Sequence, residues 1–222
     1  MKAKEKIAYA LFLNLLVVIA EAIILTKNLL TDGPAIFAYY TESANAIALV
    51  SSLVFCLFAI RFLLKGGGSI PAAVHLLRYV STSMLLLVVF VVAFVLSPRL
   101  GGLYGARMLF FSGTMFYHHL ACPALAAASF LLFERGTPLG RRHVATALIP
   151  TALYAAILVT LNALLVFSGP YPFFQIYDVP LFFSLGASAL IFAAALLTAR
   201  LLSGRPKKEE RQSFDCLPQL RL

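Results

Sequence analysis

Charged residues are scarce in this chain. Only 12% of its 222 residues are charged and 61% are hydrophobic, whereas a typical soluble domain carries about 25% charged residues. Mean hydropathy is +0.92. This composition excludes an ordinary soluble domain and predicts an all-α, polytopic integral membrane protein.

Tryptophan is absent and cysteine is rare. Without tryptophan, the aromatic belts that mark membrane interfaces fall to tyrosine. Cys56, Cys122 and Cys216 are scattered, so their spacing indicates neither a disulfide framework nor a metal site. No internal repeat is found, which counts against an inverted-repeat transporter.

Six apolar segments are long enough to cross a bilayer as helices, which takes about 20 residues each. They cover residues 7–30, 36–64, 73–96, 108–133, 144–167 and 180–202. The first is too long for the core of a signal peptide, so it is interpreted as a span. The sequence therefore predicts a six-helix transmembrane domain over residues 1–202, followed by a basic, mobile cytoplasmic tail over residues 203–222.

Basic residues are distributed unequally between the two sides of this topology. When the six spans alternate, 15 of the 18 lysine and arginine residues, Arg78 among them, fall on the side of both termini. The positive-inside rule then predicts cytoplasmic N- and C-termini. The net charge of +9 is thereby explained by topology, and no nucleic-acid partner is expected.

Two adjacent histidines, His118 and His119, interrupt the apolar fourth segment. A polar ring is costly in lipid, so it needs a partner, a water-filled cavity or a function. Neighbouring side chains point about 100° apart on a helix, which makes the two imidazoles a poor pair for one metal ion. Neither a metal nor a cofactor is expected.

The predicted topology gathers polar residues toward the outer leaflet. Thr41 and Asn45 are four residues apart, so they share one helix face. The inner half has far fewer such groups, and a polar cavity that opens toward the outer leaflet is expected. The polar residues of this outer half are Glu21, Thr41, Glu42, Asn45, His118, His119, Tyr171 and Asp178.

These residue types fit acyl transfer to water. A threonine hydroxyl such as Thr41 is a weak nucleophile until a base removes its proton, and either His118 or His119 would serve as that base. Asn45 or Tyr171 would stabilise the oxyanion. Measured from the outer ends of their spans, His118 lies about 7–8 Å deeper in the membrane than Thr41. Helix tilt would have to make up this difference for the two side chains to meet.

Glu21 or Asp178 would orient the imidazole in this hypothesis, and the substrate would be a lipid-like ester that enters from the membrane. A second hypothesis has no catalysis. In it, the same cavity binds a lipid or passes a proton or small solute, with Glu21 and the histidines as titrating groups. A third interpretation is an accessory subunit whose polar residues face a partner or hold helices together.

Three short motifs resemble known proteins. They are Phe-Ala-Tyr-Tyr-Thr-Glu-Ser-Ala-Asn at 37–45, Met-Phe-Tyr-His-His-Leu-Ala-Cys-Pro at 115–123 and Gly-Pro-Tyr-Pro-Phe at 169–173. The chain resembles an uncharacterised group of bacterial six-span proteins and, more distantly, the androgen-induced family of membrane threonine hydrolases.

This resemblance implies a hydrolase of fatty acid esters of hydroxy fatty acids in a bacterial plasma membrane. Thr41 would be its nucleophile. The His-x-x-x-x-Pro pattern of the family matches His118 and Pro123, and its Tyr-Pro-Phe matches residues 171–173. His119 has no clear counterpart in the family, so the choice between the two histidines stays open.

Overall fold

The computed structural model describes residues 2–135 and 139–204, and over these residues the chain forms helices and no strand. Six helical stretches are long and apolar enough to cross a membrane. The helices that dominate them are α1 (Ala3–Asp32), α2 (Tyr40–Leu64), α3 (Ala72–Val91), α7 (Cys122–Ser129), α8 (Arg141–Ala163) and α9 (Leu181–Ser203). The expected polytopic helical architecture is therefore present.

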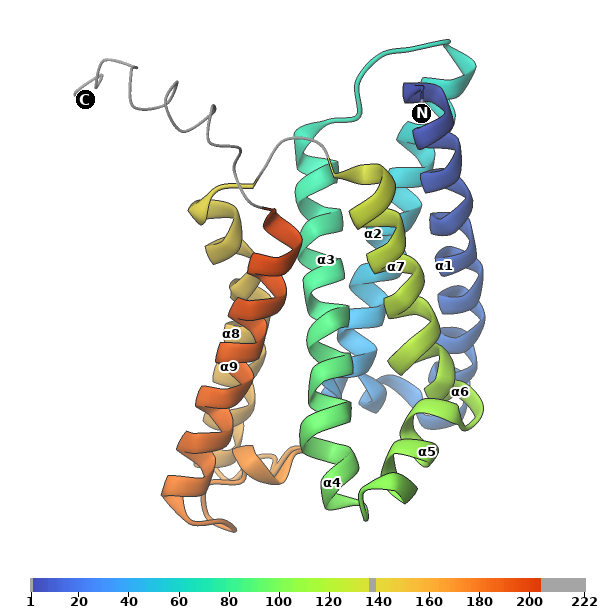
Figure 1. Cartoon of the computed structure of the whole chain (residues 1–222). Helices are drawn as coiled ribbons and strands as arrows, with labels where there is room; N and C mark the ends of the chain where they lie inside the picture. The colour runs from blue at the N-terminus through green and yellow to red at the C-terminus, as the bar shows by residue number, and fades with distance from the viewer. Residues whose placement is uncertain (1, 136–138, 205–222) are drawn as a thin grey trace, which may run out of the picture.

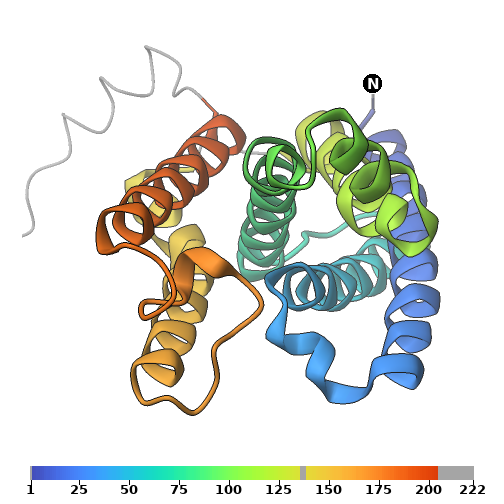
Figure 2. The same cartoon turned by 90° about the horizontal axis from the view of Figure 1, so that it is seen from below.

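Helix α3 stands between two groups of helices (Figures 1 and 2). Helices α1, α2 and α7 pack together with α3, and α8 and α9 form a hairpin on its other side. Helix α1 begins and α9 ends at one end of the bundle, called here the termini end. The opposite end, the loop end, holds residues 33–39, 97–112 and 164–180.

The fourth span begins later than the hydropathy pattern predicts. Instead of one helix over 108–133, a separate helix α5 (Leu103–Phe111) ends at Ser112, whose backbone is extended, and the membrane-length stretch is Gly113–Glu134. Gly113 has a φ of +50°, a region that glycine adopts without the Cβ clash of other residues. The chain therefore turns at a Ser-Gly-Thr step within the apolar segment.

The histidines lie in a π-helical turn of this fourth span, η3 (Tyr117–Ala121). The N–H of Cys122 reaches back five residues to the carbonyl of Tyr117. Pro123 follows at once and has no N–H to give to the carbonyl four residues earlier. Such π turns are frequent at functional sites, and this one leaves both His118 and His119 buried.

The fifth span ends earlier than predicted. Helix α8 ends at Ala163, because Leu165 has a φ of +57° and the N–H of Val166 bonds back to the carbonyl of Leu161. This is the usual way in which a helix closes with a left-handed residue. At the other boundary, α9 ends at Ser203, and positions 205–222 of the predicted tail lie outside the described residues.

Candidate functional site

His118 lies between two buried carboxylates. Its Nε2 is 3.2 Å from an oxygen of Glu21 on α1, and its Nδ1 is 3.2 Å from an oxygen of Glu42 at the start of α2. Glu21 is fully buried, His118 is 1% exposed and Glu42 is 9% exposed. The contacts have the length of ion pairs, but the Nε2 of His118 lacks the alignment of a hydrogen bond. Three ionisable groups therefore share one buried site.

The spacing of polar residues along α1 explains how Glu21 reaches this site. Asn14, Glu21 and Asn28 recur every seven residues, which places them on one face of the helix. The amide of Asn28 donates a hydrogen bond to Glu42 (3.1 Å). We call Glu21, Asn28, Glu42, Asn45 and His118 the histidine cluster.

Asn45 joins the second and fourth spans at this level. Its side-chain nitrogen is 2.9 Å from the carbonyl oxygen of Thr41 and 3.4 Å from that of His118. One amide can contact both carbonyls only when the two backbone turns lie side by side. The backbone turns of Thr41 and His118 are therefore neighbours, although Thr41 is the second residue of α2 and His118 the sixth of the fourth stretch.

His119 has a different environment. Its Nδ1 is 2.7 Å from the carbonyl oxygen of Leu109, and because a carbonyl can only accept, this nitrogen carries the proton. Leu109 lies in the last turn of α5, where carbonyls lack intrahelical partners. His119 thus holds the end of α5 against the fourth span, and His118 is the histidine that meets charge.

Thr41 and Tyr171 lie in another place, a cavity of about 40 Å³ between α2, α3, α8 and α9. The Tyr171 hydroxyl accepts a hydrogen bond from the N–H of Tyr40 (3.2 Å), at the start of α2. Burial raises the pKa of Tyr171 to about 12, so its hydroxyl stays protonated at neutral pH. The Tyr40 hydroxyl bonds to Thr151 (2.8 Å). We call this cavity the tyrosine pocket.

An apolar groove adjoins the tyrosine pocket. It has a volume of about 540 Å³, and its lining comes mainly from α2 and α8. Tyr40 and Tyr154 line both the groove and the pocket. The Tyr154 hydroxyl donates to the carbonyl of Ala38, which fixes this wall at the start of α2.

The predicted site residues therefore separate. Glu21, Asn45 and His118 lie in the histidine cluster, whereas Thr41 and Tyr171 line the tyrosine pocket. Asp178 is exposed in the loop 164–180 and makes no ion pair with either histidine. Among the described residues Thr41 makes no hydrogen bond to either imidazole.

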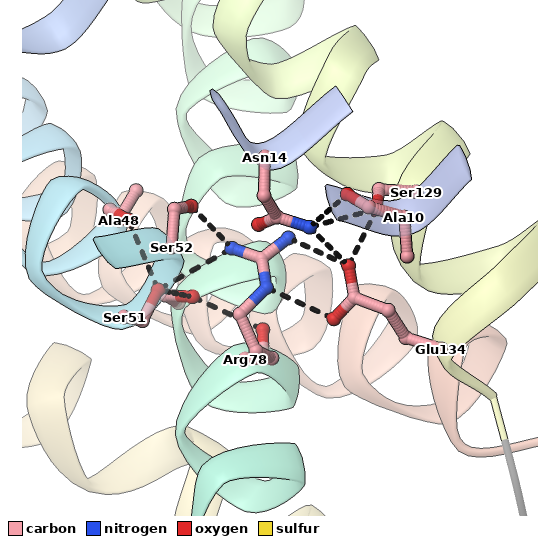
Figure 3. Close-up of polar contacts among 9 residues, drawn as sticks. Ala10, Asn14, Ala48, Ser51, Ser52, Arg78, Ser129 and Glu134 are labelled. Carbon is pink, nitrogen blue, oxygen red and sulfur yellow. Dashed lines mark hydrogen bonds and ion pairs between the residues drawn. The ribbon is translucent and has the colours of Figure 1, made fainter. Parts of the chain in front are cut away.

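A second buried ionic site lies nearer the termini end and was not predicted (Figure 3). Arg78 on α3 is paired with Glu134, with Nε 3.0 Å and Nη2 3.2 Å from its two carboxylate oxygens, and both side chains are fully buried. The guanidinium also donates to Ser51 and Ser52 on α2. Arg78 is thus part of the bundle interior, on the side of the termini to which its charge was assigned.

Asn14 completes this second site. Its amide donates to Glu134 (2.8 Å) and to Ser129 (2.9 Å), and Ser129 in turn donates to Glu134 (2.6 Å). The expectation of few polar groups in this half of the bundle is therefore wrong. An ionisable residue within a span, Arg78, was the sequence signal available for it. We call Asn14, Ser51, Ser52, Arg78, Ser129 and Glu134 the arginine cluster.

Within the described parts of the chain, no three histidine, cysteine, aspartate or glutamate side chains are placed to hold a metal ion. No protein-family model, no curated protein and no solved structure matches the chain.

Proposed function

We propose that this chain is an integral membrane protein that passes protons through its helix bundle, and that Glu21, Glu42 and His118 bind and release them. One observation carries the proposal, namely an imidazole within 3.2 Å of two buried carboxylates. Ionisable groups inside a membrane bundle are costly, and proton relays are among the functions that such groups serve.

The proton is the ligand that suits this cluster. Glu21, Glu42 and His118 line neither the tyrosine pocket nor the apolar groove, so the two spaces described above do not bring a larger molecule to them. Imidazole changes its charge near neutral pH, and carboxylates beside it can take up or give away its proton. Both oxygens of Glu21 lack an aligned hydrogen bond and remain free to accept one.

The proposed orientation places both termini of the chain in the cytoplasm. The excess of basic residues at the termini end favours cytoplasmic termini, so the histidine cluster would lie in the outer half of a bacterial plasma membrane. The arginine cluster would lie in the inner half. Protons would then reach His118 from the outer side across only part of the bundle.

Proton flux into liposomes tests this function. The purified chain is reconstituted, a potassium gradient with valinomycin sets the membrane potential, and an enclosed dye reports pH. His118→Gln keeps a polar side chain but cannot carry the proton. We expect it to lower flux by about tenfold or more, the change that roughly 1.4 kcal/mol on a barrier produces.

His143→Ala is the matched control, because it removes another histidine in the first turn of α8, outside both clusters. Its flux should equal that of the unmodified chain. Circular dichroism of each variant establishes that it is folded. Flux at the level of empty liposomes from the folded, unmodified chain would exclude the proposal, as would unchanged flux in folded His118→Gln.

A second candidate is the hydrolysis of lipid-like esters, with Thr41 as nucleophile. The observation in its favour is that Thr41 and Tyr171 line a pocket that opens beside an apolar groove of about 540 Å³. The groove would accept an acyl chain, and the Tyr171 hydroxyl would donate to the oxyanion. Asn45 links the backbone turns of Thr41 and His118, and the His118 ring would have to leave one carboxylate to reach the Thr41 hydroxyl. The same resemblance to membrane threonine hydrolases motivates this candidate.

A fluorophosphonate probe separates the two candidates. Attack by Thr41 would form an oxygen–phosphorus bond, release fluoride and pass the hydroxyl proton to His118. Mass spectrometry should then find the adduct on Thr41, and His118→Gln should slow labelling by about 10²–10⁴-fold, the usual contribution of a general base. His119→Gln is the matched control. Absence of an adduct on the folded protein, together with His118-dependent flux, would leave only the proton function.

A further inference from the structure

The two clusters form two polar layers at different depths of one bundle. Three helices each carry a buried residue at both levels, seven positions apart; five of the six side chains are polar and the sixth is the thiol of Cys122, one turn beyond His118. The pairs are Asn14 and Glu21 on α1, Asn45 and Ser52 on α2, and Cys122 and Ser129 on α7. Seven residues are two helical turns, so the layers are separated by about 10 Å along the helix axes.

A layer of apolar side chains lies between them. Val17, Ala48 and Ala126 occupy the intermediate positions of the same three helices, three or four residues from the polar positions on either side. All three are fully buried and belong to one hydrophobic cluster. Two of them are alanines, so the layer is made of small apolar side chains.

Unpartnered acceptors border this apolar layer. The side-chain oxygens of Asn14 and Asn45 and both carboxylate oxygens of Glu21 are buried without a hydrogen-bond partner among the described residues. Each of these atoms accepts a hydrogen bond and none donates one, unless Glu21 is protonated. Buried acceptors are normally satisfied, and ordered water commonly supplies the donor where side chains do not.

Both layers contain charged or titratable groups from several helices. His118 meets Glu21 from α1 and Glu42 from α2, and Cys122 and His119 are its neighbours on the fourth span. In the other layer Arg78 from α3 meets Glu134. A proton accepted in one layer therefore has ionisable groups to reach in the next.

We infer that Val17, Ala48 and Ala126 form an apolar barrier between two proton-binding layers of a single pathway, and that entry of water into this barrier limits proton passage. The inference rests on the proposed proton function. Hydrophobic constrictions gate by dewetting, so a dry layer stops protons until water bridges it. The proton then leaves the histidine cluster along that water and is accepted by the Glu134 carboxylate, with no change in oxidation state.

Variants that wet the barrier test the inference. Val17→Thr keeps the shape of the side chain and adds one hydroxyl, and Ala126→Ser does the same on another helix. Each should raise liposome proton flux by about tenfold, as expected if the barrier falls by roughly 1.4 kcal/mol. Val74→Thr is the matched control, because Val74 is buried near the termini end in a different hydrophobic cluster.

The same variants combined with His118→Gln distinguish the possible failures. A barrier in series with the histidine cluster predicts that His118→Gln also removes the added flux. Unchanged flux in both barrier variants, beside His118-dependent flux in the unmodified chain, would overturn the barrier and leave the proton function standing. Added flux that persists without His118 would show a separate leak and overturn the single pathway. If the unmodified chain passes no protons, the proton function fails and the barrier fails with it.

Discussion

Replacing Arg78 with methionine is expected to lower the free energy of unfolding by about 3–5 kcal/mol, because Glu134 is left as an unpaired charge inside the bundle. Both side chains are fully buried, and the guanidinium donates two hydrogen bonds to the carboxylate and others to Ser51 and Ser52. Methionine fills similar space, so loss of packing contributes little. Unfolding in mixed micelles, followed by circular dichroism, measures the difference.

Arg61→Met is the matched control, since Arg61 is exposed near the end of α2 and should cost little. The double variant Arg78→Met, Glu134→Leu removes both charges and should recover much of the lost stability, as replacement of buried ion pairs by apolar groups often does. If Arg78→Met alone were as stable as Arg61→Met, Glu134 would not depend on Arg78 for its charge balance. That result would also weaken Glu134 as an acceptor of protons.

The number of spans was predictable from the sequence because length and hydropathy decide it. Six stretches exceed the length that crosses a bilayer, and all six are helical. Their ends were harder to predict where apolar residues continue past the turn. Composition does not change at Leu165, and at Gly113 only the short Ser-Gly-Thr step marks the turn, so the turns depend on φ values of +57° and +50°.

The candidate site was only partly predictable. The residues were recognised as polar and intramembrane, but neighbouring positions of a helix point about 100° apart. Whether Thr41 or Glu42 meets His118 therefore depends on the rotation of α2, which packing against α1 and α3 decides. The structure turns Glu42 toward His118 and Thr41 toward Tyr171.

The arginine cluster was missed for a different reason. Arg78 lies near the termini end of its span, where a basic residue ordinarily marks the membrane boundary. Glu134 closes the fourth span and similarly resembles a boundary residue. Only the three-dimensional structure shows that the two reach each other within the bundle. The seven-residue spacing of Asn14, Glu21 and Asn28 is the sequence signal from which the inward face of α1 could have been predicted.

The second large effect is expected at the histidine cluster itself. His118→Leu should lower the free energy of unfolding by about 3–5 kcal/mol, because it leaves Glu21 and Glu42 buried without the imidazole that lies between them. Leucine is similar in size, so the loss reports charge rather than volume. The contacts of 3.2 Å on each side of the ring make His118 the nearest compensating group for both carboxylates.

Neutralising the carboxylates should reverse this effect. In the His118→Leu background, Glu21→Gln and Glu42→Gln together remove both charges and keep acceptors for neighbours such as the Asn28 amide. Interacting residues show non-additive effects on stability, so the triple variant should be more stable than His118→Leu alone. Equal stabilities would mean that the ring compensates no charge at this site. The proton function requires such compensation, because a group that passes protons must be coupled to the charges around it. The stability cycle therefore tests the electrostatic basis of the proposal without measuring any flux.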